Sequence, residues 1–345
     1  MARRTTPLNA DLPAVLTRQE LLATGHGKNR ESRTDLVKVG YGLYRRTGAG
    51  PVLPLGSDST PGLDTSEGTA QHVWPLDHLA ALLRRHPTAV LSHETAAVLH
   101  GIPLPTSRWR QLVQREDWAG VAEGLPPIHL SLPKGSLRIR RAGVVDHRRK
   151  LEAQHVTELH GLRVTTLERT WLDLCAIGYP WLLDELVAAG DHLVKHPWHP
   201  HGRLPPLSTV AEIRRALAEV GQFKGKRLAN QALELVRVGA DAPSETKMRL
   251  ALLDAGLPEP ELQCPIDPED EDSPESDLGY RDCLLAMQYE GAGHRTAEQQ
   301  TRDVRRDRYA ADRGWATLKA NVEDLRDGFR SFIRAVRARR EAFGC

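Results

Sequence analysis

The stretch that decides the fold of the C-terminal part is SDLGYRDCLLAMQYEGAGH, residues 276–294. Asp277 stands in a first short run, and a second, apolar run at 283–287 ends in the polar residues QYE at 288–290. Two such runs separated by a few turn residues predict neighbouring antiparallel strands. The polar residues at the strand ends belong either to a functional site or to ordinary solvated strand ends.

The segments on both sides of this stretch extend the prediction to a whole domain. The predicted elements are a helix capped by Ser244 that ends at Gly256, a strand at 260–266, a strand that ends near 277–280, a strand at 283–289, a polar helix at 296–313, a strand at 315–319 and a helix at 322–341. This order suits a mixed sheet flanked by helices. We therefore expect a domain over residues 244–345.

Three acidic residues are expected to become neighbours in that domain. Asp277 and Glu290 lie on or just after adjacent strands, and Glu245 lies on a helix that must pack against the sheet. Mg²⁺ prefers hard oxygen ligands, and a bound metal can activate water and stabilise a reacting phosphate. Asp277 and Glu290 are the candidate metal ligands, and His294 could move a proton. Because acidic residues are common at strand ends, a purely structural role stays open.

The N-terminal segment predicts a small winged helix-turn-helix domain over residues 1–50. Thr17 precedes Glu20 by three residues, a capping-box start to a helix, and a second short helix is predicted at 30–37. The segment KVGYGLYRR then predicts a turn and a strand, the wing. The candidate phosphate contacts are Lys28, Arg30, Arg33, Lys38, Arg45 and Arg46. A small solvated α/β subdomain is the alternative.

The middle of the chain predicts a mixed α/β domain over residues 74–195, after a loop-like segment at 48–73. Helical spacing occurs in LDHLAALLRRH and SHETAAVLHG, with Ser92 as the expected cap of the second helix. Strands are expected at 128–133 and 142–149, followed by a short strand and a helix that Thr166 caps and that ends at Gly178. Residues 196–243 predict a Pro-rich loop with linking helices, and the three histidines of that loop are taken as solvated.

Composition sets limits on location and partners. The net charge of +2 indicates no global basicity, although residues 267–277 are mostly acidic and arginines outnumber acids from 302 to 340. The four cysteines form no CxxC pair, so we expect reduced thiols and a cytoplasmic protein. We expect no membrane partner, because no apolar run approaches the roughly 20 residues that span a bilayer.

Two parts of the chain resemble known families. Residues 244–325, through SETKMRLALLDAGLPEP, DLGYRDCLLAMQYEGAGH and the helix RTAEQQTRDVRRDRYAADRGW, resemble the endonuclease-like domain related to very-short-patch-repair endonucleases, a branch of the PD-(D/E)xK superfamily. The upstream part resembles the AbiEi-like proteins of actinobacteria, through VLSHETAAVLHGIPLP, IHLSLPKGS, VVDHRR and GLRVTTLERTWLDL. The resemblance implies an α/β and α+β multidomain protein: a winged helix-turn-helix, a mixed α/β middle domain, and a restriction-endonuclease-like mixed sheet flanked by helices.

The resemblance also assigns roles to residues. Glu245 matches the helix glutamate, Asp277 the first strand carboxylate, and Gln288 and Glu290 the paired positions of the E-x-D or E-x-K motif, with His294 after the strand. Gln288 departs from the pattern, because a neutral amide offers a metal an oxygen without charge. Arg302, Arg305 and Arg306 are the candidate DNA contacts of the polar helix.

Three functions follow as hypotheses. The resemblance implies a DNA-binding regulator or antitoxin with a cognate toxin as partner, and we favour it because Gln288 removes one charged ligand. The alternative is an active Mg²⁺-dependent DNA endonuclease that uses Asp277 and Glu290. A scaffold protein without a nucleic-acid role is the third.

Overall fold

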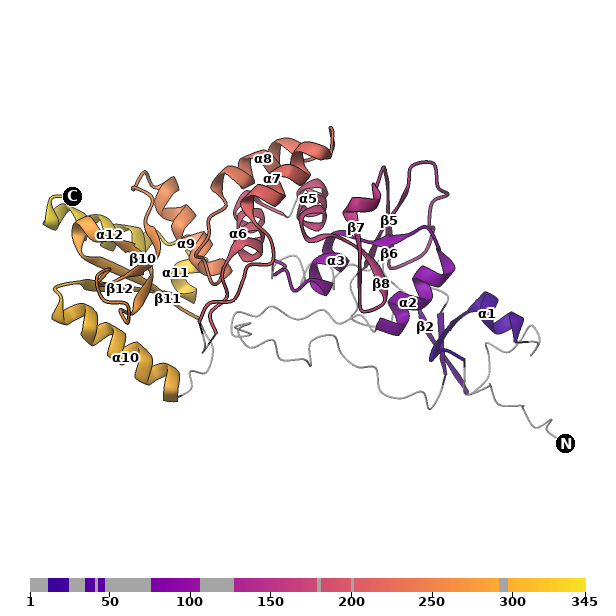
Figure 1. The fold of residues 1–345 in the computed structure, drawn as a ribbon, viewed down its shortest axis with the longest axis horizontal. Helices are drawn as coiled ribbons and strands as arrows, with labels where there is room; N and C mark the ends of the chain where they lie inside the picture. The colour runs from indigo at the N-terminus through magenta and orange to yellow at the C-terminus, as the bar shows by residue number, and fades with distance from the viewer. Residues whose placement is uncertain are drawn as a thin grey trace. The chain divides into compact units, whose positions relative to one another are not determined.

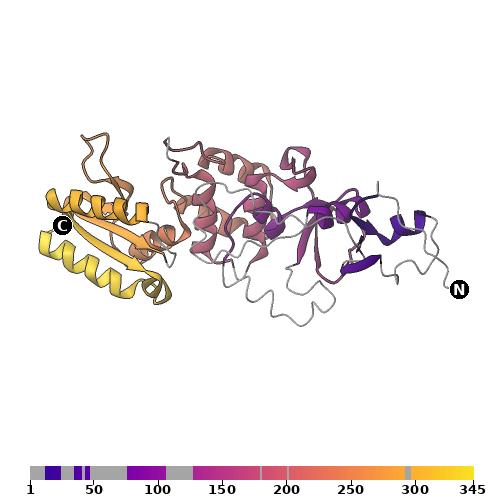
Figure 2. The same ribbon diagram turned by 90° about the horizontal axis from the view of Figure 1, so that it is seen from below.

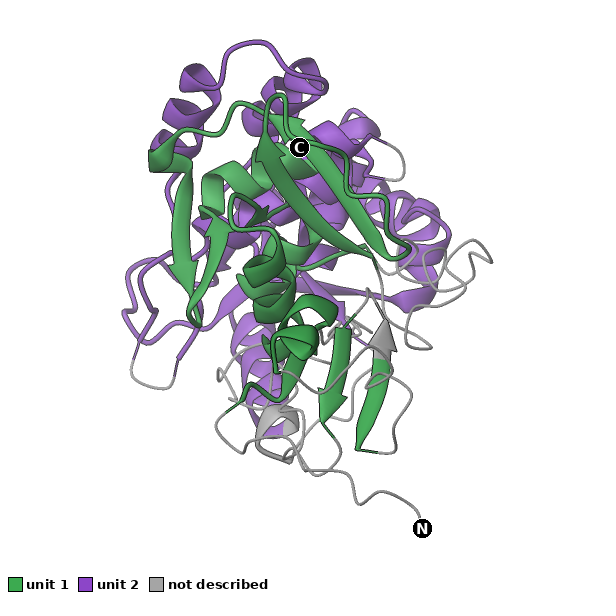
Figure 3. Ribbon diagram, turned by 90° about the vertical axis from the view of Figure 1, so that its right-hand side faces the viewer, with its two compact units in different colours: residues 1–59, 70–174 green, residues 60–69, 175–345 purple. Residues whose placement is uncertain are grey.

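The chain forms two compact units that both combine helices with sheets. The computed structural model describes residues 12–24, 35–40, 43–46, 76–105, 127–178, 181–199, 202–291 and 297–345. Unit 1 consists of residues 1–59 and 70–174, and unit 2 of residues 60–69 and 175–345 (Figure 3). The predicted α/β and α+β multidomain class is confirmed at this level. No helix of the described residues is long and apolar enough to cross a membrane.

Unit 1 begins with a three-stranded antiparallel sheet of order β1-β3-β2. Its elements are β1 (Val15–Thr17), α1 (Arg18–Ala23), β2 (Leu36–Gly40) and β3 (Leu43–Arg46). The predicted capping box is present, because the Thr17 hydroxyl accepts from the Glu20 amide while the Glu20 carboxylate accepts from the Thr17 amide. The helix predicted at 30–37 is wrong at Leu36 and Val37, where pairing with β3 imposes a strand.

The second sheet of unit 1 has five strands in the order β6-β5-β4-β8-β7. The elements are α2 (Leu76–Arg85), β4 (Val90–Leu91), α3 (His93–Leu99), β5 (Ile128–Pro133), β6 (Val144–Arg149), β7 (Val156–Leu159), β8 (Leu162–Thr165) and α5 (Leu167–Ile177). Strands β5 and β6 run parallel. Leu79 and Leu82 of α2 share one buried core with Leu130 of β5 and with Val15 of the small sheet.

Two predicted helix caps are corrected. Ser92 stands at the N-cap of α3, but its hydroxyl makes no capping hydrogen bond and contacts His93 Nδ1 and the Ser131 hydroxyl at 2.9 Å each. Ser244 is not a cap, because α9 (Pro243–Asp254) begins one residue earlier with Ala242 as its N-cap. In both places the serine is buried, and at Ser92 neighbouring side chains compete for the hydroxyl.

Unit 2 combines a set of helices with a four-stranded sheet of order β12-β11-β10-β9. The elements are α6 (Leu183–Val194), α7 (Val210–Glu219), α8 (Lys226–Leu235), α9, β9 (Glu261–Pro265), β10 (Glu275–Tyr280), β11 (Leu285–Glu290), α10 (Ala297–Asp312), β12 (Ala316–Asn321), α11 (Val322–Arg326) and α12 (Arg330–Phe343). Strands β9, β10 and β11 are antiparallel, and β12 runs parallel to β11.

Helices cover both faces of the unit 2 sheet. Met248 of α9 and Phe332 of α12 pack on one face, whereas Ala310 of α10 packs with Ala286 of β11 on the other. Figures 1 and 2 show α10 and α12 on opposite sides of the strands. The predicted order of elements is confirmed, except that the last helix is broken at Gly328 and Phe329, which both have positive φ. The face that α10 covers carries the candidate site.

A disulfide joins Cys283 to Cys345 across 62 residues of sequence, which corrects the expectation of reduced thiols at these two positions. Cys175 and Cys264 remain buried thiols. The absence of a CxxC motif says nothing about cysteines that are distant in sequence. Cys283 and Cys345 meet because α12 packs near the turn after β10.

We expect reduction of this disulfide to lower the free energy of unfolding of unit 2 by about 2–4 kcal/mol, because the bond restricts the unfolded chain. Thiol titration of the unfolded protein should give two thiols without reductant and four with it. Cys345→Ser should unfold like the reduced wild type and become insensitive to reductant. Four thiols without reductant would contradict the pairing.

Candidate active site

The centre of the site is a row of three side chains that crosses the unit 2 sheet. Leu278 of β10 pairs with Met287 of β11, so Asp277, one residue earlier, lies beside Gln288. Gln288 in turn pairs with Lys319 of β12. Because side chains alternate along a strand, Gln288 shares the face of Ala286, which packs against α10. Asp277, Gln288 and Lys319 therefore point to the α10 side.

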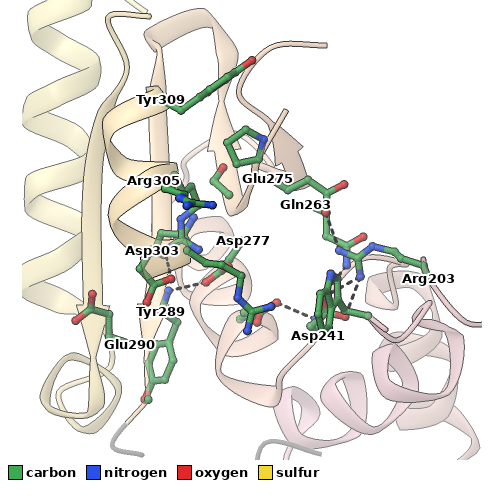
Figure 4. A pocket seen from close by; sticks show the side chains of 18 of the residues that line it. Arg203, Asp241, Gln263, Glu275, Asp277, Tyr289, Glu290, Asp303, Arg305 and Tyr309 are labelled. Carbon is green, nitrogen blue, oxygen red and sulfur yellow. Dashed lines mark hydrogen bonds and ion pairs between the residues drawn. The ribbon is translucent and has the colours of Figure 1, made fainter. Parts of the chain in front are cut away.

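A pocket of about 750 Å³ opens next to this row, between the sheet, α10 and the start of α9 (Figure 4). Its polar lining includes Arg203, Asp241, Glu245, Gln263, Glu275, Asp277, Gln288, Glu290, Arg302, Asp303, Arg305 and Arg306. Four of the predicted catalytic residues and all three predicted arginines of α10 thus line one pocket. His294, the fifth predicted catalytic residue, lies outside the described residues.

The two carboxylates nearest the row are held by backbone amides. Asp277 Oδ2 accepts the Tyr289 N–H at 2.7 Å, and Glu245 Oε2 accepts the Asp241 N–H at 2.8 Å. Burial raises the pKa of Asp277 to about 6. Burial, together with repulsion from Asp277 and Asp241, raises the pKa of Glu245 well above its usual value. Such crowding of buried carboxylates favours a bound cation, because a positive charge would offset both their burial and their mutual repulsion.

Gln288 and Glu290 differ in their surroundings. The Gln288 side chain is 3% exposed, and its Nε2 has no hydrogen-bond partner among the described residues. Glu290 instead lies 3.1 Å from Lys319 Nζ, which also lies 2.7 Å from Asp307. The carboxylates of Asp307 and Glu290 raise the pKa of Lys319. Lys319 therefore holds Glu290 and adds a fixed positive charge beside Gln288.

The arginines of α10 are available to a ligand to different degrees. Arg302 lies over the Trp198 ring at 5.1 Å, and Arg306 pairs with Asp303 at 3.1 Å. Arg305 is exposed and makes no ion pair with any described residue. On the opposite rim, Arg203 bridges Asp241 and Glu275. Exposed cations thus stand beside buried carboxylates, an arrangement that suits an anionic ligand bound together with a cation.

Mg²⁺ fits part of this donor set. Asp277, Glu245 and the Gln288 amide would hold it, through oxygen atoms of the kind that Mg²⁺ prefers. Glu290, the other predicted metal ligand, instead forms an ion pair with Lys319. Among the described residues, the groups of three ligand atoms within 4.8 Å of one another lie elsewhere, so the pocket carboxylates form no closed cluster.

Sequence reasoning missed Lys319 and Asp241. In the strand WATLK, alternation alone would place Lys319 on one face with Thr317, but the pairing of Lys319 with Gln288 depends on a crossover through α10. Asp241 precedes α9, and no pattern in the sequence links it to the sheet. Asp277 and Glu290 as metal ligands stay a prediction.

The predicted DNA contacts of unit 1 are only partly described. Lys38 is exposed on β2, and Arg45 is half-buried on β3. Arg46 donates to the Leu12 carbonyl and so holds the segment before β1. Lys28, Arg30 and Arg33 lie outside the described residues.

Comparison with known proteins finds relatives without an assigned role. The chain is similar to uncharacterized proteins of two strains of Mycobacterium tuberculosis, with 32% identity over 117 residues. This similarity covers 34% of the chain and 43% of the relatives, so the chain matches less than half of their length. No protein-family model matches the chain.

Proposed function

We propose that this protein binds DNA and that the pocket of unit 2 contacts the phosphodiester backbone. The observation that carries the proposal is that Arg302, Arg305 and Arg306 line the same pocket as Asp277 and Gln288. Arginines donate to phosphate oxygens in a planar fork, and phosphate contacts supply most non-specific DNA affinity. The site therefore combines phosphate donors with groups that can hold a cation next to the phosphate.

The N-terminal elements add a second part to this proposal. We take α1 and the hairpin of β2 and β3 as part of a winged helix-turn-helix, with Lys38 exposed on the hairpin. The resemblance to AbiEi-like proteins makes a cytoplasmic regulator or antitoxin with a cognate toxin the favoured role. Unit 2 would then bind DNA without cleaving it.

Charge removal on α10 tests this proposal. We expect the full-length protein to bind duplex DNA of mixed sequence, with affinity that falls steeply between about 50 and about 200 mM salt. In the variant Arg302→Ala/Arg305→Ala/Arg306→Ala, affinity at low salt should fall by about tenfold or more, and the salt slope should decrease by about one per lost contact. Fluorescence anisotropy measures both quantities.

Arg334→Ala is the matched control, because Arg334 is an exposed arginine on α12, the helix on the other face of the sheet. It should bind as the wild type does. Absence of binding at low salt, or equal binding by the triple variant, would contradict the proposal.

A Mg²⁺-dependent DNA endonuclease is the second candidate. The row of Asp277, Gln288 and Lys319 beside Glu245 favours it, since carboxylates and a lysine next to phosphate donors suit hydrolysis. When bound, Mg²⁺ would polarise the phosphodiester and lower the pKa of water. Lys319 would stabilise negative charge on the phosphate, while α10 would orient the strand.

A further inference from the structure

A second cluster of titratable side chains lies inside unit 1, remote in sequence from the pocket residues. Its centre is three histidines: His93 at the start of α3, His129 on β5 and His147 on β6. His93 and His129 are 1% and 4% exposed, and His147 is half-buried. Parallel pairing of β5 with β6 and the antiparallel pair β4–β5 bring the three elements together.

The three imidazoles contact one another. His129 Nδ1 lies 3.0 Å from His147 Nε2, and the His93 ring stacks on the His147 ring with 3.5 Å between centroids. Burial lowers the pKa of His93 well below its usual value and that of His147 to about 3. The three rings thus form one contiguous group of potential ligand atoms.

Carboxylates border the histidines. Glu94 Oε2 lies 3.3 Å from His129 Nε2, and Asp173 Oδ2 lies 3.8 Å from His93 Nδ1. Asp173 Oδ1 accepts from Arg149 and Arg169, which compensates that carboxylate and leaves Glu94 as the acidic group facing His129.

Two buried polar atoms of the cluster lack a hydrogen-bond partner among the described residues. Neither His129 Nε2 nor Asp173 Oδ2 makes a hydrogen bond of acceptable geometry with any described residue. A buried polar atom left unsatisfied costs about 1–3 kcal/mol, so such atoms point to a group that completes them. One ligand atom from each histidine lies within 4.8 Å of the other two.

We propose that His93, His129 and His147, together with Glu94, form a binding site for a transition-metal ion of the zinc class. Three imidazole nitrogens and one carboxylate are a donor set that Zn²⁺ accepts, whereas Mg²⁺ prefers oxygen ligands. All of these residues belong to unit 1, and the proposal does not depend on the function proposed for the pocket of unit 2.

Metal binding at this site requires a rearrangement. A metal lies in the plane of each imidazole that binds it, but the His93 and His147 rings are stacked within 15° of parallel. At least one ring must therefore rotate. Each nitrogen that binds the metal must also give up its present contact: His129 Nδ1 lies 3.0 Å from His147 Nε2, and His93 Nδ1 and Nε2 lie 2.9 and 2.8 Å from Ser92 Oγ and Arg149 Nη2. His147 is the least buried of the three and can rotate most easily.

The test uses the full-length chain, freed of metal by a chelator and titrated with Zn²⁺ and with Co²⁺. We expect one ion per chain and, for Co²⁺, the visible absorption bands of a four-coordinate ion. His129→Ala and Glu94→Gln should each weaken binding by about tenfold to 100-fold or more. His196→Ala, in the Pro-rich loop, is the control and should bind as the wild type does.

If His129→Ala fails to fold, as judged by circular dichroism, His147→Gln on the half-buried ring gives the same comparison. Wild-type protein that binds neither ion, or variants of the cluster that retain wild-type affinity, would overturn the proposal. The first result would leave a hydrogen-bonded histidine cluster, and the second would place the ion elsewhere.

Discussion

Arg249→Met should destabilise unit 2 by about 3–5 kcal/mol, because it leaves the buried Asp191 carboxylate without a positive charge to pair with. Arg249 on α9 is 0% exposed, and its Nη2 lies 3.2 Å from Asp191 Oδ2 of α6 and 2.7 Å from the Leu235 carbonyl. Nη1 binds Glu259 at 2.8 Å. The Arg249 guanidinium of α9 thus contacts both α6 and the end of α8. Urea unfolding measures the effect.

The pH dependence of this change has a definite sign. Burial raises the pKa of Asp191 to about 6, even though Arg249 lowers it. A carboxyl with a raised pKa binds its proton more tightly in the folded state, so its contribution to stability is present at low pH and is lost as the pH rises toward 6. In Arg249→Met this pKa should rise further. The loss of stability should then be larger at pH 7 than at pH 4.

Two variants separate the buried charge from lost packing. Arg326→Met removes an exposed cation that pairs with Glu323, and it should cost no more than about 1 kcal/mol. Arg249→Met/Asp191→Asn removes both charges of the buried pair and should recover part of the lost stability. If the double variant is as unstable as Arg249→Met, packing rather than charge governs this position.

The sequence indicated most elements of the fold because their signals are local. The capping box at Thr17 and Glu20 and the apolar runs of β10 and β11 required no knowledge of distant residues. The helix predicted at 30–37 failed at Leu36 and Val37 because strand pairing with β3 outweighed helical spacing. The bond between Cys283 and Cys345 was missed for the related reason that its partners are 62 residues apart.

The residues of the candidate sites also differ in whether the sequence could predict that they lie together. Asp277 and Gln288 could be placed beside each other from the alternation of two adjacent strands. Lys319 could not, because its pairing with Gln288 requires the parallel crossover through α10. The cluster of His93, His129 and His147 also escaped prediction, since it depends on the order β6-β5-β4 in a mixed sheet. Non-local strand order is therefore the information that one sequence did not provide.

Cleavage assays with plasmid DNA and Mg²⁺ or Mn²⁺ decide between the two candidate functions. If the pocket is a nuclease site, Asp277→Ala should reduce nicking by about 100-fold or more, the scale expected when a group that activates or positions the reacting atoms is lost. Lys319→Ala should also reduce it, while the DNA affinity contributed by Arg302, Arg305 and Arg306 remains. Asp267→Ala, which removes an ion pair with Arg313 outside the pocket lining, is the control and should nick as the wild type does.

Gln288→Glu distinguishes a weak site from an inactive one. The substitution places a third carboxylate beside Asp277 and Glu245, which should strengthen the attraction for a divalent cation. Nicking that appears only in Gln288→Glu would indicate that the natural amide has switched off a nuclease site and would favour the regulator. Nicking by the wild type that Asp277→Ala abolishes would establish the endonuclease. Equal nicking by wild type and Asp277→Ala would exclude this pocket as its source, because no catalyst centred on Asp277 can survive loss of that carboxylate.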